Sequence, residues 1–403
     1  MHIDLTHPDV RANPYPTYAY LREHAPVVSV RRPVIGRVWY LSRYEDVVAA
    51  LRDPRLVNDR RNVGDGRGDP WWLPKALNAF RDSMITADDP SHRRLRGLVQ
   101  LAFTPRMIES LRAQVEAVVA ERLELLAANS RAGAADLIAD FALPVPLAII
   151  STMMGVRPGS DLAFHRMTNR FLEIADRGLL GLVFGARNTI KMVRFFRELI
   201  ADHRRERRDD LVTALLDAEA DGERLSEEEV LSMIFLLLLA GHETTVNLIG
   251  NGTLALLDNP AALAELREDP SLLDSAVEEL LRYANPVEQT SPRFAKEALE
   301  IRGHRIARGD VVIPLVASAN RDPAAFERAD TLDLRRAPNR HVALGLGIHY
   351  CLGAPLARME GRIAFRGLLE RFQDIRLRIP RDRVQWRGSS LVRGLRALPL
   401  TVA

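Results

Sequence analysis

Residues 344–355 read LGLGIHYCLGAP, and Cys351 within them is the only cysteine of the 403-residue chain. A single cysteine cannot form an internal disulfide. Glycines at 345, 347 and 353 allow the backbone to turn tightly and to approach another group closely. Pro355 fits the first positions of a helix. The pattern therefore predicts an irregular loop followed by a helix beginning at Ala354-Pro355, with the cysteine just before that helix.

Such a helix end would stabilise a negative sulfur at Cys351, because its unpaired N–H groups and its dipole place positive charge there. Thiolate is the form of cysteine that ligates metals. A flat cofactor with a central metal would fit a loop whose backbone can be approached so closely. Two alternatives stay open from the loop alone. Cys351 could be a small buried hydrophobe, as free cysteines usually are, or a nucleophile with His349 as its base, although catalytic partners usually come from distant sequence.

A long helix is predicted from Ser226 to about Leu257. Ser226 and Glu229 have the spacing of a capping box, and Asn259-Pro260 ends the pattern. Residues 233–240 are apolar on all sides, which indicates burial. This apolar run is much shorter than the roughly 20 residues that cross a bilayer.

Polar residues interrupt the apolar run in the stretch AGHETT, residues 240–245. A buried acid and hydroxyl are costly without partners, so we expect a local kink or a widened turn here. Ala240 and Thr244 are four residues apart and share a face. The small Ala240 leaves room for a ligand, Thr244 can hold a water, and Glu243 can pass protons. An ordinary helix interior with threonines bonded back to the backbone is the alternative.

A third motif is Glu279-Leu280-Leu281-Arg282, whose acid and base can pair on one helical face. Together the three motifs resemble the cytochrome P450 family. Gly345-x-Gly347-x-His349-x-Cys351-x-Gly353 is similar to its haem-binding loop, and residues 240–245 are similar to its oxygen-activating helix. Leu344 departs from the pattern, because the family usually has Phe there. The likeness also extends over residues 13–22, 89–92, 320–323 and 392–395, and so over essentially the whole chain.

The resemblance implies a haem-thiolate monooxygenase with Cys351 as the axial ligand of the iron of haem b. It implies that Glu243 and Thr244 form the catalytic acid–alcohol pair, beside Ala240. Contacts to the haem propionates would come from His92, Arg96, Arg293 and His349. Arg336, from a later segment, would join Glu279 and Arg282 in a buried structural trio beneath the cysteine loop.

By family position, eight residues would line a substrate pocket: Met84, Ile85, Leu236, Leu237, Val287, Thr290, Leu391 and Val392. They favour a sizeable apolar small molecule, such as a macrolide or other polyketide, a terpenoid, a steroid or a fatty acid. The implied reaction inserts one atom of O2 into a C–H bond, by hydroxylation or epoxidation. A peroxide-driven peroxygenase and a non-catalytic haem sensor or carrier are alternatives, but neither needs the Glu243–Thr244 pair.

Electrons would come from NAD(P)H through a ferredoxin reductase and a ferredoxin, because no flavin or ferredoxin module is visible in the sequence. Arg358, Arg362 and Arg366 repeat every four residues on the helix after Cys351. We expect them to help dock an acidic ferredoxin; an ordinary exposed helix face is the alternative.

Helical patterning dominates the chain, at 112–128, 188–204, 227–257, 262–268, 272–284 and 355–372. Strands are predicted at Val38–Leu41 and Val311–Ile313, with a turn at Arg302-Gly303. This predicts one α-rich domain over residues 1–403 with small β-sheets, which the resemblance implies is the triangular-prism fold of the family. A formal charge of +3 argues against a nucleic-acid binder. The N-terminal residues lack a signal-peptide pattern. We therefore expect a cytoplasmic bacterial monomer without a membrane anchor.

Overall fold

The computed structural model describes residues 5, 7–32, 35–64, 83–156, 178–220, 222–387 and 391–403, apart from the side chains of Pro8, of 178–189 and of Leu239. The chain forms two compact units. Unit 1 contains Met1–Gly66, Glu116–Pro144 and Thr244–Ala403, and unit 2 contains Arg67–Val115 and Val145–Glu243. The expectation of a single haem domain over the whole chain stays a prediction.

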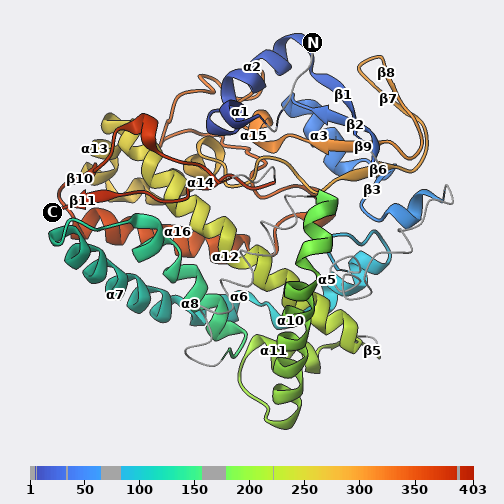
Figure 1. Ribbon diagram of the computed structural model, residues 1–403, viewed down its shortest axis with the longest axis horizontal. Coiled ribbons are helices and arrows are strands. Elements are labelled where there is room, and N and C mark those ends of the chain that lie inside the picture. The colour runs from blue at the N-terminus through green and yellow to red at the C-terminus, as the bar shows by residue number, and fades with distance from the viewer. Residues whose placement is uncertain are drawn as a thin grey trace. The chain divides into compact units, whose positions relative to one another are not determined.

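A five-stranded mixed sheet lies in unit 1, in the order β1-β2-β9-β6-β3 (Figure 1). Strands β2 and β9 pair in parallel, with Val38 opposite Val311, and the other pairs are antiparallel. Trp39 and Leu41 of β2 enter one apolar cluster, and Val38 and Tyr40 enter another. Both faces of β2 are therefore covered, which explains its unbroken apolar sequence. The strands are β1 Val27–Arg32, β2 Gly36–Leu41, β3 Leu56–Val57, β6 Arg293–Ala295 and β9 Val311–Pro314.

Smaller strand pairs complete the β-structure. Strands β7 (Leu299–Ile301) and β8 (His304–Ile306) form a hairpin. Its turn residues Arg302 and Gly303 have φ angles of 48° and 77°, so the predicted turn is confirmed. β10 (Ile375–Leu377) pairs with β11 (Leu400–Val402) in unit 1, and β4 (Glu219–Ala220) pairs with β5 (Glu223–Arg224) in unit 2.

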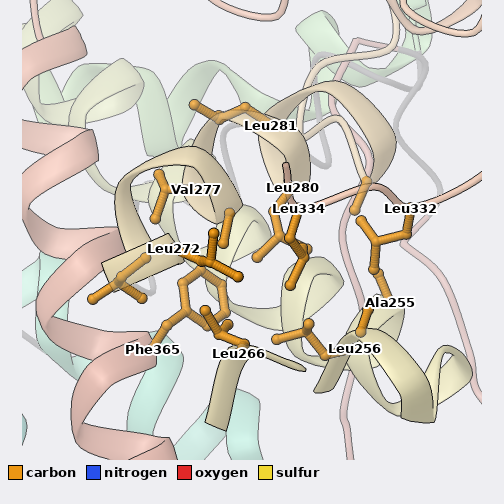
Figure 2. Packing of buried hydrophobic residues seen from close by; sticks show 14 of the residues in the cluster. Ala255, Leu256, Leu266, Leu272, Val277, Leu280, Leu281, Leu332, Leu334 and Phe365 are labelled. Atoms are coloured by element: carbon orange, nitrogen blue, oxygen red, sulfur yellow. The ribbon is translucent and has the colours of Figure 1, made fainter. Parts of the chain in front are cut away.

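The helices of unit 1 bury a leucine-rich core around Phe365 (Figure 2). Phe365 comes from α16 (Ala354–Arg371), and its neighbours Leu266, Leu272 and Val277 come from or adjoin α13 (Pro260–Glu268) and α14 (Leu273–Tyr283). At Gly252 a Cβ would lie 2.6 Å from the Phe365 ring, so glycine allows the close packing of α16 on the central helix. Leu344, at the start of the cysteine loop, packs against the same core. Further helices of unit 1 are α1 Pro8–Ala12, α2 Tyr15–His24, α3 Tyr44–Arg52 and α15 Val316–Ala319.

The central helix α12 runs from Glu227 to Asp258, as the sequence predicts. Its capping box is confirmed: the Ser226 N–H donates to the Glu229 carboxylate at 2.8 Å, and the Glu229 N–H donates to Ser226 Oγ at 3.3 Å. By length and composition alone α12 could cross a membrane, but 71% of its apolar window is buried within the protein.

The widened turn that was one of two expectations for residues 240–245 is wrong, because α12 is assigned as α-helix throughout them, whereas the other expectation, a kink, stays a prediction. Two of its polar side chains find partners without opening a turn. His242 Nδ1 bonds the Leu238 carbonyl at 2.7 Å, and the Thr245 hydroxyl bonds Glu360 of α16. A π-helical turn occurs instead at Ile138–Ala142.

The described part of unit 2 contains α5 (Ser91–Ala102), α6 (Pro105–Ser110), α10 (Gly178–Arg205) and α11 (Leu211–Asp217), together with most of α8 (Pro144–Met153) and the first half of α12. Helix α7 (Arg112–Arg131) begins in unit 2 and runs into unit 1. The helix predicted at 188–204 begins earlier, at Gly178. The ring of buried His203 in α10 bonds the Leu199 carbonyl of the same helix and the carboxylate of Asp210, both at 2.8 Å. Gly155 packs against this pair, since a Cβ there would lie 2.3 Å from Asp210. Short 3-10 turns are Arg60–Val63, Pro270–Leu272, Gly347–His349 and Arg381–Arg383.

Candidate active site

The cysteine loop in unit 1 ends where the sequence predicts, with α16 beginning at Ala354 and Pro355 in its first turn. The Cys351 N–H donates to the Leu344 carbonyl at 2.9 Å, which closes the loop on itself. Cys351 is half-buried, and its Sγ lies 4.0 Å from the place of a Cβ at Gly353. The sulfur thus lies at the positive end of an 18-residue helix, which favours its ionised form.

Two glycines give the loop its shape. Gly345 and Gly347 have φ angles of +73° and +72°, a conformation that other residues rarely adopt. A Cβ at Gly347 would lie only 2.9 Å from the Leu51 carbonyl of α3. The loop is therefore held against the last turn of α3, and Gly347 is required both by its backbone angle and by the space available.

A buried ion network supports the segment that leads into this loop. Glu279 and Arg282 of α14 are both fully buried, with N···O distances of 2.7 and 2.8 Å. Arg336 donates to the same carboxylate at 3.1 Å, as do the Asp333 N–H at 2.9 Å and Asn339 at 3.1 Å. Arg282 also donates to the carbonyls of Asn320, Ala329 and Thr331. The structure therefore brings the predicted trio together and ties α14 to residues 320–339.

One face of α12 remains accessible in the largely buried middle of the helix. Leu236, Leu237, Gly241 and Thr244 are half-buried and Ala240 is exposed, whereas Leu238, His242, Glu243 and Thr245 are buried. Positions 237, 240, 241 and 244 recur at helical spacing, so they form one stripe. Four residues predicted for the site, namely Leu236, Leu237, Ala240 and Thr244, lie on or beside this stripe, and Glu243 lies next to it on the buried side.

Glu360 is a buried acid that sequence reasoning missed. It lies on α16, nine residues after Cys351, with an exposed fraction of 1%. Burial raises the pKa of Glu360 to about 8, and the hydrogen bond from Thr245 opposes this rise only in part. The position reads as an ordinary helical glutamate in the sequence, and only the packing of α16 on α12 brings it to Thr245.

The predicted cationic residues lie on three elements. Arg293 begins β6 and is 5% exposed, and His349 ends the 3-10 turn before Cys351; both belong to unit 1. His92 and Arg96 share one face of α5 in unit 2. Burial lowers the pKa of His92, and the neighbouring charge of Arg96 lowers it further. His92 is therefore a neutral side chain with a hydrogen to donate at physiological pH.

The predicted pocket residues of unit 1 lie on two segments that bond to each other. Val287 and Val392 form an isolated antiparallel bridge, and the Glu288 N–H donates to the Leu391 carbonyl at 2.9 Å. The Thr290 N–H donates to the carbonyl of Pro314 on β9. Val287, Thr290 and Val392 are half-buried and Leu391 is 42% exposed. In unit 2, Met84 is buried and Ile85 is 41% exposed.

Comparison with known proteins assigns this architecture. The family model described as cytochrome P450 matches residues 32–383. This chain belongs to the cytochrome P450 family. As in other members, the fold is α-rich with small β-sheets, and the protein is a P450 monooxygenase, an oxidoreductase.

Bacterial P450 proteins are similar over nearly the full length. The polyketide biosynthesis cytochrome P450 PksS of Bacillus subtilis is 40% identical over 395 residues, which cover 97% of this chain and 96% of that protein. The 6-deoxyerythronolide B hydroxylase of Saccharopolyspora erythraea is 40% identical over 393 residues, covering 96% and 95%. The solved structure of the bacillaene polyketide synthase P450 PksS superposes with a TM-score of 0.92 at 38% identity and covers 100% of both chains.

Membership in the P450 family implies haem, and the residues present fit it. The chain's one thiol lies at a helix N-terminus, where it can serve as an anionic axial ligand. The exposed Ala240 places a small side chain on the accessible stripe of α12. Arg293, Arg96 and the two histidines offer donors of the kind that propionate carboxylates require. The alternative of a Cys351–His349 hydrolase is overturned by the family match.

Proposed function

We propose that Cys351 is the axial thiolate of a haem b and that Glu243 and Thr244 deliver protons for oxygen activation. The observation that carries the proposal is the Cys351 loop, whose hydrogen bond to Leu344 and whose glycine angles present the sulfur at the start of α16. When bound, haem supplies the iron at which O2 is activated for insertion into a C–H bond. The protein supplies binding, orientation and protons.

His92, Arg96, Arg293 and His349 would bind the propionates. A neutral, buried His92 can donate one hydrogen bond without adding charge, whereas the two arginines supply the positive charge. Arg293 is buried, and its guanidinium donates to the Leu56 carbonyl at 3.4 Å. A propionate would add an anionic acceptor to this buried charge.

Thr244 and Glu243 divide the proton work in this proposal. Thr244 is on the accessible stripe, so its hydroxyl can hold a water or donate to a ligand there. Glu243 is 3% exposed and adjacent in sequence, so it lies beside that stripe, on its buried flank. An acid placed there can receive protons and pass them through Thr244 to the accessible face.

The substrate is proposed to be a sizeable apolar small molecule of the polyketide or macrolide class, and the reaction a hydroxylation or epoxidation. The apolar side chains at 236, 237, 287 and 392 suit an apolar ligand. Two relatives whose names refer to polyketide biosynthesis and to a 6-deoxyerythronolide B hydroxylase support the class. We place the enzyme in the bacterial cytoplasm as part of the same proposal.

Electrons are proposed to come from NAD(P)H through a ferredoxin reductase and a ferredoxin. The ion pairs of the three predicted arginines bear on which of them would attract a ferredoxin. Arg358 pairs with Glu278 at 2.6 Å and Arg362 pairs with Asp274 at 2.8 Å, so acids of α14 neutralise both. Arg366 is exposed, and no ion pair involves it in the described part of the chain. Arg366→Glu should therefore slow reduction by ferredoxin at low salt more than Arg362→Glu does. Equal rates of reduction in both variants and in the wild type would show that ferredoxin does not dock on this helix face.

The proposal is tested by the absorption spectrum of the dithionite-reduced protein under carbon monoxide. Thiolate ligation predicts a strongly red-shifted Soret band, and Cys351→Ser should lose it. A band typical of histidine-ligated haem would contradict the thiolate assignment. Product formation with NADH and a surrogate redox chain separates a monooxygenase from a sensor or carrier, and activity only with added hydrogen peroxide would identify a peroxygenase instead.

A further inference from the structure

Tyr18, Glu288 and Arg393 form a buried cluster in unit 1 that the proposed function does not use. Their exposed fractions are 5%, 8% and 7%. The Tyr18 hydroxyl donates to Glu288 Oε2 at 2.5 Å, and Arg393 Nη1 lies 3.4 Å from Glu288 Oε1. One carboxylate thus accepts from two residues that are 270 and 105 positions away in sequence.

The same three residues lie behind the pair of segments proposed to line the pocket. Val287 and Val392 face each other across the isolated bridge. Two main-chain hydrogen bonds flank the bridge. The Glu288 N–H donates to the Leu391 carbonyl, and the Arg393 N–H donates to the Pro286 carbonyl at 2.8 Å. In extended chain, neighbouring side chains point to opposite faces. The side chains of Glu288 and Arg393 therefore point away from the face that carries Val287 and Val392.

The N-terminal helices fix this rear face. Arg393 donates to the carbonyls of Arg11 and Ala12, at 2.7 and 2.9 Å, at the end of α1. Its guanidinium also stacks 3.6 Å from the centre of the Trp386 ring. Tyr18 comes from α2, and burial followed by the charge of Glu288 raises its pKa well above the usual value, so its hydroxyl remains a donor. The position of the bridge is thus set from α1 and α2.

We propose that Tyr18, Glu288 and Arg393 are positioning residues that set the placement of Val287 and Val392 and thereby the size selectivity of the substrate pocket. This inference rests on the proposed function, because it takes these two valines as pocket residues. A half-satisfied buried carboxylate would be expensive, so loss of either donor would let the bridge move. The chemistry at Cys351 should be unaffected, because the cluster makes none of the contacts of the cysteine loop described above.

The test uses 1-alkylimidazoles, from 1-methylimidazole to 1-dodecylimidazole, as ligands of the full-length haem-loaded protein. The imidazole group is common to the series, so the ratio of dissociation constants between long and short members reports the fit of the tail alone. Titrations are followed by the Soret shift for wild type, Tyr18→Phe and Glu288→Gln. Tyr44→Phe is the matched control, because it removes a tyrosine hydroxyl that donates to the Arg340 carbonyl, elsewhere in unit 1.

We expect both cluster variants to change the long-to-short ratio by roughly three- to tenfold, with the constant for 1-methylimidazole and the carbon monoxide band retained. Tyr44→Phe should keep the wild-type ratio. The double variant should show about the effect of one single variant, because both act on one network. An unchanged ratio in both variants, or a wild-type protein that does not discriminate tail length, overturns the inference. Loss of the carbon monoxide band in the wild type would instead refute the proposed function.

Discussion

Glu279 and Arg282 lie one turn apart on α14, both with no exposed surface, and the arginine donates two hydrogen bonds of 2.7 and 2.8 Å to the two oxygens of the carboxylate. Removing one partner strands a buried charge, which costs roughly 3–5 kcal/mol. We therefore expect Glu279→Gln and Arg282→Ala to lower the free energy of unfolding by that amount, measured by urea denaturation. Arg335→Ala, which breaks exposed pairs with Glu265 and Asp269, should leave the free energy of unfolding nearly unchanged, because solvent screens exposed ion pairs. Equal effects would contradict a structural role for the buried trio.

Gly347 offers a second test through a pair of glycines with similar backbone angles. Gly347 and Gly303 have φ of +72° and +77°, but a Cβ would meet the Leu51 carbonyl at 2.9 Å in the first and open space in the second. Gly303→Ala should lower the free energy of unfolding by about 1 kcal/mol, through backbone strain alone. Gly347→Ala should cost more and should also reduce the haem content per chain, measured as the ratio of Soret to protein absorbance. Similar haem content in both variants would show that the loop tolerates the displacement.

Glu360 predicts a pH dependence of stability. Its pKa is about 8 in the folded protein against an ordinary value of 4.5, with burial as the main cause. Below the ordinary value both states hold the proton; as the pH rises towards 8, the unfolded chain releases it and the folded chain does not, so stability falls. The loss of stability is roughly 1.4 kcal/mol for each pH unit that separates the folded from the unfolded pKa.

Glu360→Gln should remove this pH dependence of the free energy of unfolding between pH 4.5 and 8. The stability of the variant relative to the wild type should therefore increase as the pH rises. The measurement is a series of urea titrations across that range. Glu370→Gln, at an exposed position of the same helix, serves as the control and should leave the slope unchanged. Parallel curves for Glu360→Gln and the wild type would show that Glu360 ionises normally.

Thr244→Ala tests the proposed proton delivery. Without the hydroxyl, protons should reach the accessible face of α12 less readily, so a larger share of the NADH consumed should yield hydrogen peroxide, and product per NADH should fall by about tenfold or more. The measurement is product, peroxide and NADH in one assay with a surrogate redox chain. Thr253→Ala removes a buried hydroxyl further along the same helix and should keep the wild-type coupling. Normal coupling in Thr244→Ala would exclude the role.

Local signals made several features predictable. Ser226 and Glu229 satisfy each other within one turn, Pro355 marks the start of α16, and Arg302-Gly303 adopts the turn angles that join β7 and β8. The pairing of Glu279 with Arg282 depends on residues three apart. Each prediction rests on contacts that a short piece of chain makes with itself.

Long-range partners explain what the sequence could not predict. Thr245 of α12 bonds Glu360 of α16, and Glu288 meets Tyr18 from 270 positions away. Nor does the pattern of residues 27–41 and 293–314 indicate that β9 lies between β2 and β6. The family resemblance supplied Arg336 as a partner of Glu279, which spacing alone did not.

The parallel pairing of β2 with β9 also bears on how the chain is made. Val38 cannot pair until Val311 has been synthesised, which is 273 residues later (311 − 38). At roughly 5–20 residues per second, the apolar hairpin of β1 and β2 leaves the ribosome on the order of tens of seconds before its neighbour exists. During that interval β2 offers an unpaired edge to any other nascent chain. Slower initiation or a chaperone that shields residues 36–41 should therefore raise the soluble yield without any change to the finished enzyme.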